Sequence, residues 1–151
     1  MSLARLQSIL TLGIWTVVAA VFFITAFAAG GPASYSEASP RRLVGAIFLA
    51  VGIFGTPLMR WLTRRRVGSA AVPHDERDER LGARSTSVGL VIVAMGVFLA
   101  SIALWEGYQD AGSVPVGWMW ILGYGTVILT YLAPAAIFLA LDLGMVGRGQ
   151  E

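Results

Sequence analysis

The stretch from Ser8 to Ala29 reads SILTLGIWTVVAAVFFITAFAA, 22 residues without a charged side chain. The hydrocarbon core of a bilayer is about 30 Å thick, and a helix rising about 1.5 Å per residue needs roughly 20 apolar residues to cross it. Because this core offers no water, the segment has to be helical to pair its own backbone groups. Ser8–Ala29 is therefore predicted to be a transmembrane helix.

Three further stretches have the same character: Leu43–Leu62, Thr86–Trp105 and Trp118–Leu141. The chain of 151 residues is 56% hydrophobic and 13% charged, whereas soluble domains carry about 25% charged residues. Arg60, near the end of its span, is the only charged residue inside any of the four. The composition excludes a disordered chain and disfavours an ordinary soluble enzyme. It predicts an all-α membrane protein, a four-transmembrane-helix bundle, with residues 1–151 as one membrane domain.

The arginines predict the direction of the spans. All 11 basic residues are arginine, and nine lie in the two tails, in segment 63–85 or at the adjoining Arg60. The opposite loops hold only Arg41 and Arg42. Because basic residues stay on the cytoplasmic side, both termini and loop 63–85 are predicted to be cytoplasmic. We expect an integral protein of a prokaryotic cytoplasmic (inner) membrane.

Aromatic residues near the span ends fit interfacial belts. These residues are Trp61, Trp105, Trp118 and Trp120, with Tyr35 and Tyr108 nearby. Trp15 lies deeper in the first span and is not explained by such a belt.

The end of the first span leaves an alternative open. Ala26-Phe27-Ala28, followed by Ala29, resembles a signal-peptide cleavage site. The apolar run is longer than a usual signal core, and only one arginine precedes it, which favours a retained helix. The intact mass of the purified protein distinguishes the two.

The segment between spans two and three carries the most distinctive charge pattern. Arg64-Arg65-Arg66 follows the second span, and a flexible stretch leads to Pro73. Asp75-Glu76-Arg77-Asp78-Glu79-Arg80 then predicts a helix start, because carboxylates favour the first turn. Glu76 and Arg80 have the spacing of an i,i+4 ion pair. We expect this helix to run unbroken into the third span.

These charges are the candidate docking residues. The arginines either anchor the topology or bind anionic lipid, at about 1 kcal/mol each near the surface. The acidic stretch is either a solvated helix face or a contact for a cytoplasmic protein. The candidate residues are Arg60, Arg64, Arg65, Arg66, Asp75, Glu76, Asp78, Glu79 and Arg80.

Several kinds of chemistry have no support. The chain has no cysteine, which excludes disulfides and thiolate sites. The spans hold no Asp, Glu, Lys or His at membrane depth, which disfavours proton-coupled transport. His74 with Asp78, and Asp75 with Glu79, are poor metal ligands because Arg77 and Arg80 interleave them. We therefore expect no catalytic residue, metal or cofactor, and no nucleic-acid partner.

Two glycine pairs mark close helix packing. Gly45 and Gly52, and likewise Gly89 and Gly96, are seven residues apart and so share a helix face. Small residues let transmembrane helices approach closely. We expect spans two and three to pack on each other there, unless a stripe serves a homo-oligomer instead.

Span four gives an alternative function. Pro134 interrupts it, as Pro57 interrupts span two, and Thr126 and Thr130 add polar groups. Such groups either hydrogen-bond across helices or line a cavity. The alternative is thus a passive small-solute transporter or channel subunit.

The Asp-Glu-Arg-Asp run at 75–78, just before the third span, resembles a motif of known membrane proteins. The chain is similar to a group of small prokaryotic four-helix membrane proteins with a D-E-R-[DE] motif there. The lysine-rich helix that often follows the motif is missing here. The group has no established function, so no site residue is implied. Some members are found near small helix-turn-helix regulators, which implies a role in signalling. We expect a non-catalytic accessory or regulatory protein that docks through segment 64–84.

Overall fold

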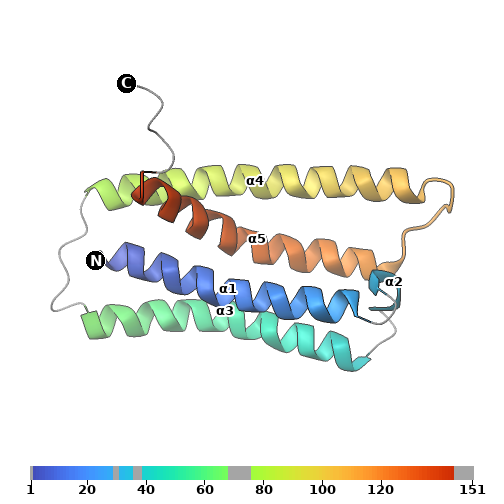
Figure 1. The fold of residues 1–151 in the computed structure, drawn as a ribbon, viewed down its shortest axis with the longest axis horizontal. Coiled ribbons are helices and arrows are strands. Elements are labelled where there is room, and N and C mark those ends of the chain that lie inside the picture. The colour runs from blue at the N-terminus through green and yellow to red at the C-terminus, as the bar shows by residue number, and fades with distance from the viewer. Residues whose placement is uncertain (1, 29–30, 36–38, 68–75, 145–151) are drawn as a thin grey trace, which may run out of the picture.

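Helices are the only regular secondary structure among the residues that the computed structural model describes, 2–28, 31–35, 39–67 and 76–144. Its elements are α1 (Leu3–Phe27), α2 (Gly31–Tyr35), α3 (Ser39–Val67), α4 (Glu76–Tyr108) and α5 (Val116–Asp142). The four long helices lie alongside one another, and the short α2 lies at one end of the bundle (Figure 1). All four are long and apolar enough to cross a membrane, which confirms the predicted four-helix, all-α fold and agrees with an integral membrane protein.

The helices extend beyond the predicted spans. The second begins at Ser39 and not at Leu43, since Pro40 in its first turn has no N–H to leave unpaired. The loop between the first two spans contains the short helix α2. The run of α4 from Glu76 to Tyr108 without interruption confirms the helix that was predicted to lead into the third span.

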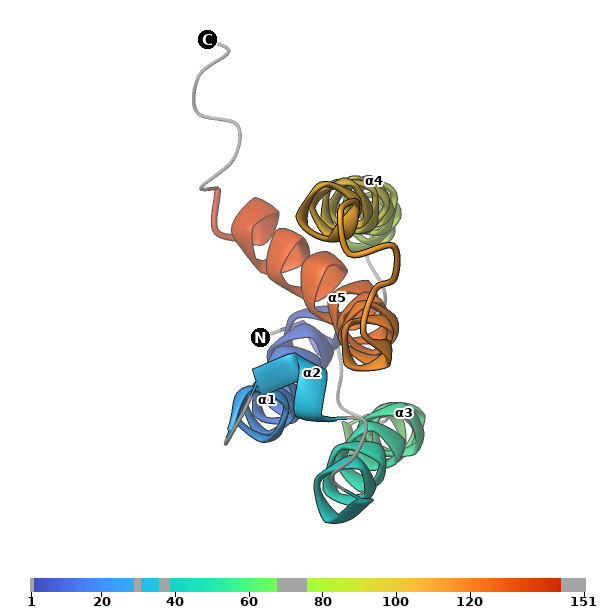
Figure 2. The same cartoon turned by 90° about the vertical axis from the view of Figure 1, so that its right-hand side faces the viewer.

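The helices form an open row in the order α4, α5, α1, α3. Helix α5 packs on α4 and α1, and α1 packs on α3; viewed end-on, α3 and α4 are the outer members (Figure 2). Large apolar side chains on these outer helices face away from the protein, with Phe54 74% and Trp105 69% exposed. Contiguous exposed apolar surface of this kind is rare on soluble monomers, and lipid is its expected surrounding.

Trp15 of α1 joins three helices in the centre of the row. Its indole is fully buried. The Nε1 group donates a 2.9 Å hydrogen bond to Thr56 Oγ1 on α3, and the ring stacks on Tyr131 of α5 at 4.2 Å between centroids. Thr56 in turn donates to the carbonyl of Gly52 at 2.7 Å. A buried tryptophan needs a partner for its N–H. The hydrogen bond to Thr56 therefore accounts for the deep position of Trp15, which an aromatic belt at the membrane interface does not explain.

The glycine stripes pack on helices other than those expected. The predicted pairing of spans two and three is wrong, because α3 and α4 share no substantial contact among the described residues. Gly52 of α3 instead faces α1, where an added Cβ would lie 3.2 Å from Trp15 Cη2. Gly89 of α4 faces α5, where an added Cβ would lie 2.7 Å from Pro134 Cγ. The row interposes α5 and α1 between the two stripes.

Helix α2 closes the end of the bundle opposite the N-terminus (Figure 1). Its Tyr35 was expected at the membrane interface but is fully buried. The ring meets Phe22 edge-on, with 6.0 Å between centroids, and its hydroxyl lies where a Cβ at Gly45 would collide. Burial raises the pKa of the Tyr35 phenol. The residue is therefore a neutral part of the core.

Replacing Thr56 by valine is expected to destabilise the fold by about 1–2 kcal/mol, because the buried Trp15 N–H loses its acceptor. Thr56→Ser keeps the acceptor and should retain most of the stability. The matched control is Thr25→Val, since the Thr25 hydroxyl bonds only carbonyls of its own helix. Unfolding of the purified protein in detergent, followed by circular dichroism, measures the difference. Equal effects of Thr56→Val and Thr25→Val would contradict a linking role for Trp15.

Gly89→Ala is expected to loosen the contact between α4 and α5 at a cost of about 1–3 kcal/mol, because overpacked groups force neighbours apart. An added Cβ would lie 2.9 Å from the backbone nitrogen of Pro134, which cannot rotate away. Gly96→Ala is the control on the same stripe, where the nearest atom, Leu129 Cδ1, is 4.0 Å away. The same unfolding measurement should find Gly96→Ala neutral or slightly stabilising. A neutral Gly89→Ala would show that α4 and α5 do not pack in this way.

Candidate functional site

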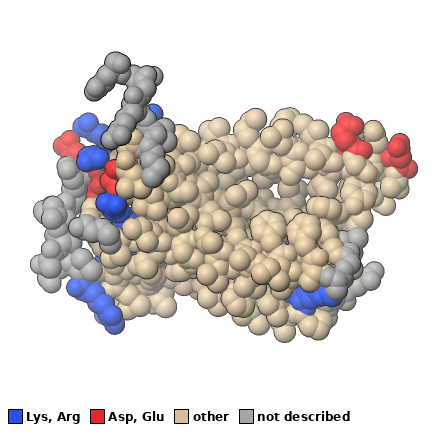
Figure 3. All heavy atoms as spheres, viewed as in Figure 1, with Lys and Arg blue, Asp and Glu red and all other residues tan. Residues whose placement is uncertain are grey.

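Charged side chains gather at the two ends of the bundle and leave its middle bare (Figure 3). One end joins the start of α1, the end of α3, the start of α4 and the end of α5. We call it the charged end. Arg41, Arg42, Glu106 and Asp110 lie toward the opposite end. The fold thus brings together charges that are far apart in the sequence.

An arginine cluster, Arg64, Arg65 and Arg66, occupies the last turn of α3. All three side chains are exposed, and none lies within ion-pair distance of a carboxylate among the described residues. The Arg65 guanidinium stacks over the ring of Trp61, 4.0 Å from its centroid. Cations are favoured at a helix C-terminus, and the stacking holds one of them beside an aromatic ring suited to the membrane interface.

The start of α4 is largely self-neutralised. Arg80 Nη2 lies 3.1 Å from Glu76 Oε2, which confirms the predicted i,i+4 ion pair. Both side chains are more than four-fifths exposed, so the pair contributes little to stability. His74 and Asp75, as well as Arg148 of the C-terminal tail, lie outside the described residues.

A hollow of about 540 Å³ opens between the helices at this end. All four long helices line it, and we call it the polar hollow. Its hydrogen-bonding and charged lining includes Gln7, Ser8, Thr11, Arg60, Asp78 and Glu79. Pro134, Ala135 and Phe138 of α5 form an apolar wall. The docking residues predicted from the sequence are therefore divided: Arg60, Asp78 and Glu79 line the hollow, whereas the arginine cluster faces outward.

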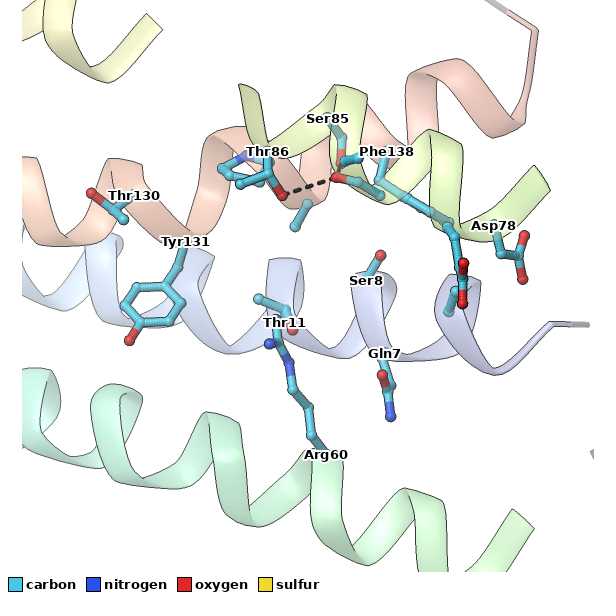
Figure 4. Close-up of a pocket in the computed structure, with 16 residues that line it drawn as sticks. Gln7, Ser8, Thr11, Arg60, Asp78, Ser85, Thr86, Thr130, Tyr131 and Phe138 are labelled. Atoms are coloured by element: carbon cyan, nitrogen blue, oxygen red, sulfur yellow. Dashed lines mark hydrogen bonds between the residues drawn. The ribbon is translucent and has the colours of Figure 1, made fainter. Parts of the chain in front are cut away.

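Two polar groups at the hollow lack partners. Thr11 is 2% exposed, and its Oγ1 has no hydrogen-bond partner among the described residues, like Nε2 of Gln7. The Arg60 side chain extends from α3 toward Thr11 of α1 (Figure 4). A buried hydroxyl without a partner costs about 1–3 kcal/mol. The hollow thus contains two hydrogen-bonding groups that no described residue satisfies.

The start of α1 and the end of α5 meet beside this hollow. Arg5 Nε of α1 lies 3.5 Å from Asp142 Oδ2 at the end of α5. Asp142, which directly follows the fourth predicted span, is thus paired with the N-terminal segment. This ion pair ties the two central helices together at the charged end.

A second hollow of about 420 Å³ lies between α4 and α5 nearer the opposite end, visible as a gap in Figure 3. Its lining is nearly all apolar and includes Gly96, Ala100 and Gly125. Gly89 and Val93 are buried and line neither hollow. Thr126 and Thr130 donate hydrogen bonds to carbonyls of α5 itself, those of Leu122 and Thr126.

Sequence reasoning missed the contribution of α1 to the site. No motif marked Gln7, Ser8 and Thr11, because they lie at the start of an apolar stretch or just before it and carry no charge. Their spacing, i, i+1 and i+4, places them near one another on the helix surface, and this was the available signal.

Comparison with known proteins adds no assignment. No protein-family model, no curated protein and no solved structure matches this chain.

Proposed function

We propose that this protein is a non-catalytic accessory protein of a prokaryotic cytoplasmic membrane, which docks on anionic headgroups through its arginine cluster. The observation that supports this proposal is the exposed run Arg64–Arg66, which pairs with no carboxylate of the described residues and ends a helix apolar enough to span a membrane. At this position each guanidinium lies at headgroup level, where about 1 kcal/mol per charge is gained from anionic lipid.

The accessory role follows from the resemblance to small membrane proteins found near regulators. In this proposal both termini and segment 63–85 face the cytoplasm, where anionic lipid is available. The stacking of Arg65 on Trp61 at 4.0 Å supports a lipid contact, because an interfacial tryptophan fixes the depth of the guanidinium.

The test is lipid retention by the full-length protein. The protein is reconstituted into nanodiscs of equal parts phosphatidylglycerol and phosphatidylcholine, and the retained lipids are counted by native mass spectrometry. We expect Arg65→Gln with Arg66→Gln to lower the preference for phosphatidylglycerol about tenfold or more, since two charges near the surface are lost.

The matched control is Arg41→Gln with Arg42→Gln at the opposite end. Its effect should be smaller, because Arg41 already donates to the carbonyl of Ala28 at 2.9 Å and acidic residues share that end. Equal losses in the two double variants would refute docking through the arginine cluster.

A further inference from the structure

The polar hollow presents opposite charges from opposite walls. Arg60 comes from α3, whereas Asp78 and Glu79 come from α4, and these helices are the outer members of the row (Figure 2). None of the three forms an ion pair with another described residue. A cation and two carboxylates that face one space without pairing suit a ligand that carries both a positive and a negative charge.

The hydrogen-bonding groups place the negative part of such a ligand. Thr11 Oγ1 and Gln7 Nε2 are buried without partners, and the Arg60 side chain extends from α3 toward Thr11 (Figure 4). Amide, hydroxyl and guanidinium groups can all donate to oxygen, and arginine suits the geometry of a phosphate. This side of the hollow therefore fits a phosphate oxygen, and the carboxylates opposite fit an ammonium group.

The remaining wall and the size set the class of ligand. Pro134, Ala135 and Phe138 supply an apolar surface beside the charges. A hollow of about 540 Å³ lies within the range of small-molecule sites, about 300–1,000 Å³. It lies toward one end of four helices that are apolar enough to cross a membrane.

We propose that the polar hollow binds a zwitterionic phosphate ester of an amino alcohol that carries a primary ammonium. The phosphate lies against Arg60, Thr11 and Gln7, and the ammonium lies against Asp78 and Glu79. The source is either the headgroup of phosphatidylethanolamine or its soluble form, glycerophosphoethanolamine. This site is separate from the arginine cluster and goes beyond the docking function proposed above.

Calorimetric titration of the full-length protein in a non-ionic detergent tests the proposal. The probes are short-chain phosphatidylethanolamine, phosphatidylcholine and phosphatidylglycerol with identical tails, and glycerophosphoethanolamine. We expect phosphatidylethanolamine to bind about tenfold or more tightly than the other two lipids, because only its headgroup offers the carboxylates a hydrogen-bond donor that is also a cation. Equal binding by glycerophosphoethanolamine would support the proposal with a soluble ligand, and its failure to bind would support the lipid as the source.

Variants separate this hollow from the rest of the charged end. Arg60→Gln and Asp78→Asn should each weaken phosphatidylethanolamine binding about tenfold or more. Arg77→Gln and Glu76→Gln remove one charge of each sign at exposed positions of the charged end, outside both the hollow and the arginine cluster. They should leave binding within about twofold.

The variant Thr11→Val tests the site without destabilising the fold. Removing an unpaired buried hydroxyl should preserve or raise the melting temperature without ligand, while it lowers the rise in melting temperature that phosphatidylethanolamine causes. The proposal is overturned if phosphatidylglycerol binds as tightly in an Arg60-dependent manner, or if Asp78→Asn and Thr11→Val bind like the unmodified protein. Equal losses in the two control variants would overturn it as well.

Discussion

The arrangement of the bundle depends on a single buried side chain, the indole of Trp15. Its N–H reaches Thr56 on α3, and its ring stacks on Tyr131 of α5. Lipid tails are as apolar as leucine, so helices in a membrane associate through close packing and hydrogen bonds. An indole supplies both at once. The absence of a side chain at Gly52 lets the ring lie against the backbone of α3.

The open row that follows from this core determines the character of the charged end. With α1 and α5 in the middle, the outer helices approach the polar hollow from opposite sides. Arg60 and the pair Asp78 and Glu79 thereby face one space without neutralising each other. Packing of α3 on α4 would have brought these charges together directly. The polar hollow is thus a consequence of helix order, and the arginine cluster lies outside it.

The periodic and compositional signals predicted the fold well. Three predicted features depend only on interactions between residues that are close in the sequence. They are the span lengths, the helix leading into the third span and the Glu76–Arg80 ion pair. The glycine stripes indicated close approach but not the partner helix, because a small residue has no chemistry that selects one. The roles of Trp15, Thr11 and Tyr35 depend on contacts between distant segments, which one sequence does not encode as a pattern. The same holds for the division of the predicted docking residues between the hollow and the outer surface.

Membrane topology, on which the assignment of the charged end to the cytoplasm depends, is tested most directly by thiol labelling. The chain has no cysteine, so the single variants Ser2→Cys and Ser113→Cys each carry one reactive group, at opposite ends of the bundle. In intact cells an impermeant thiol reagent should label the Ser113→Cys variant and label the Ser2→Cys variant only after the membrane is permeabilised. Labelling of Ser2→Cys in intact cells, or identical labelling of both variants, would contradict a four-span protein whose charged end lies in the cytoplasm.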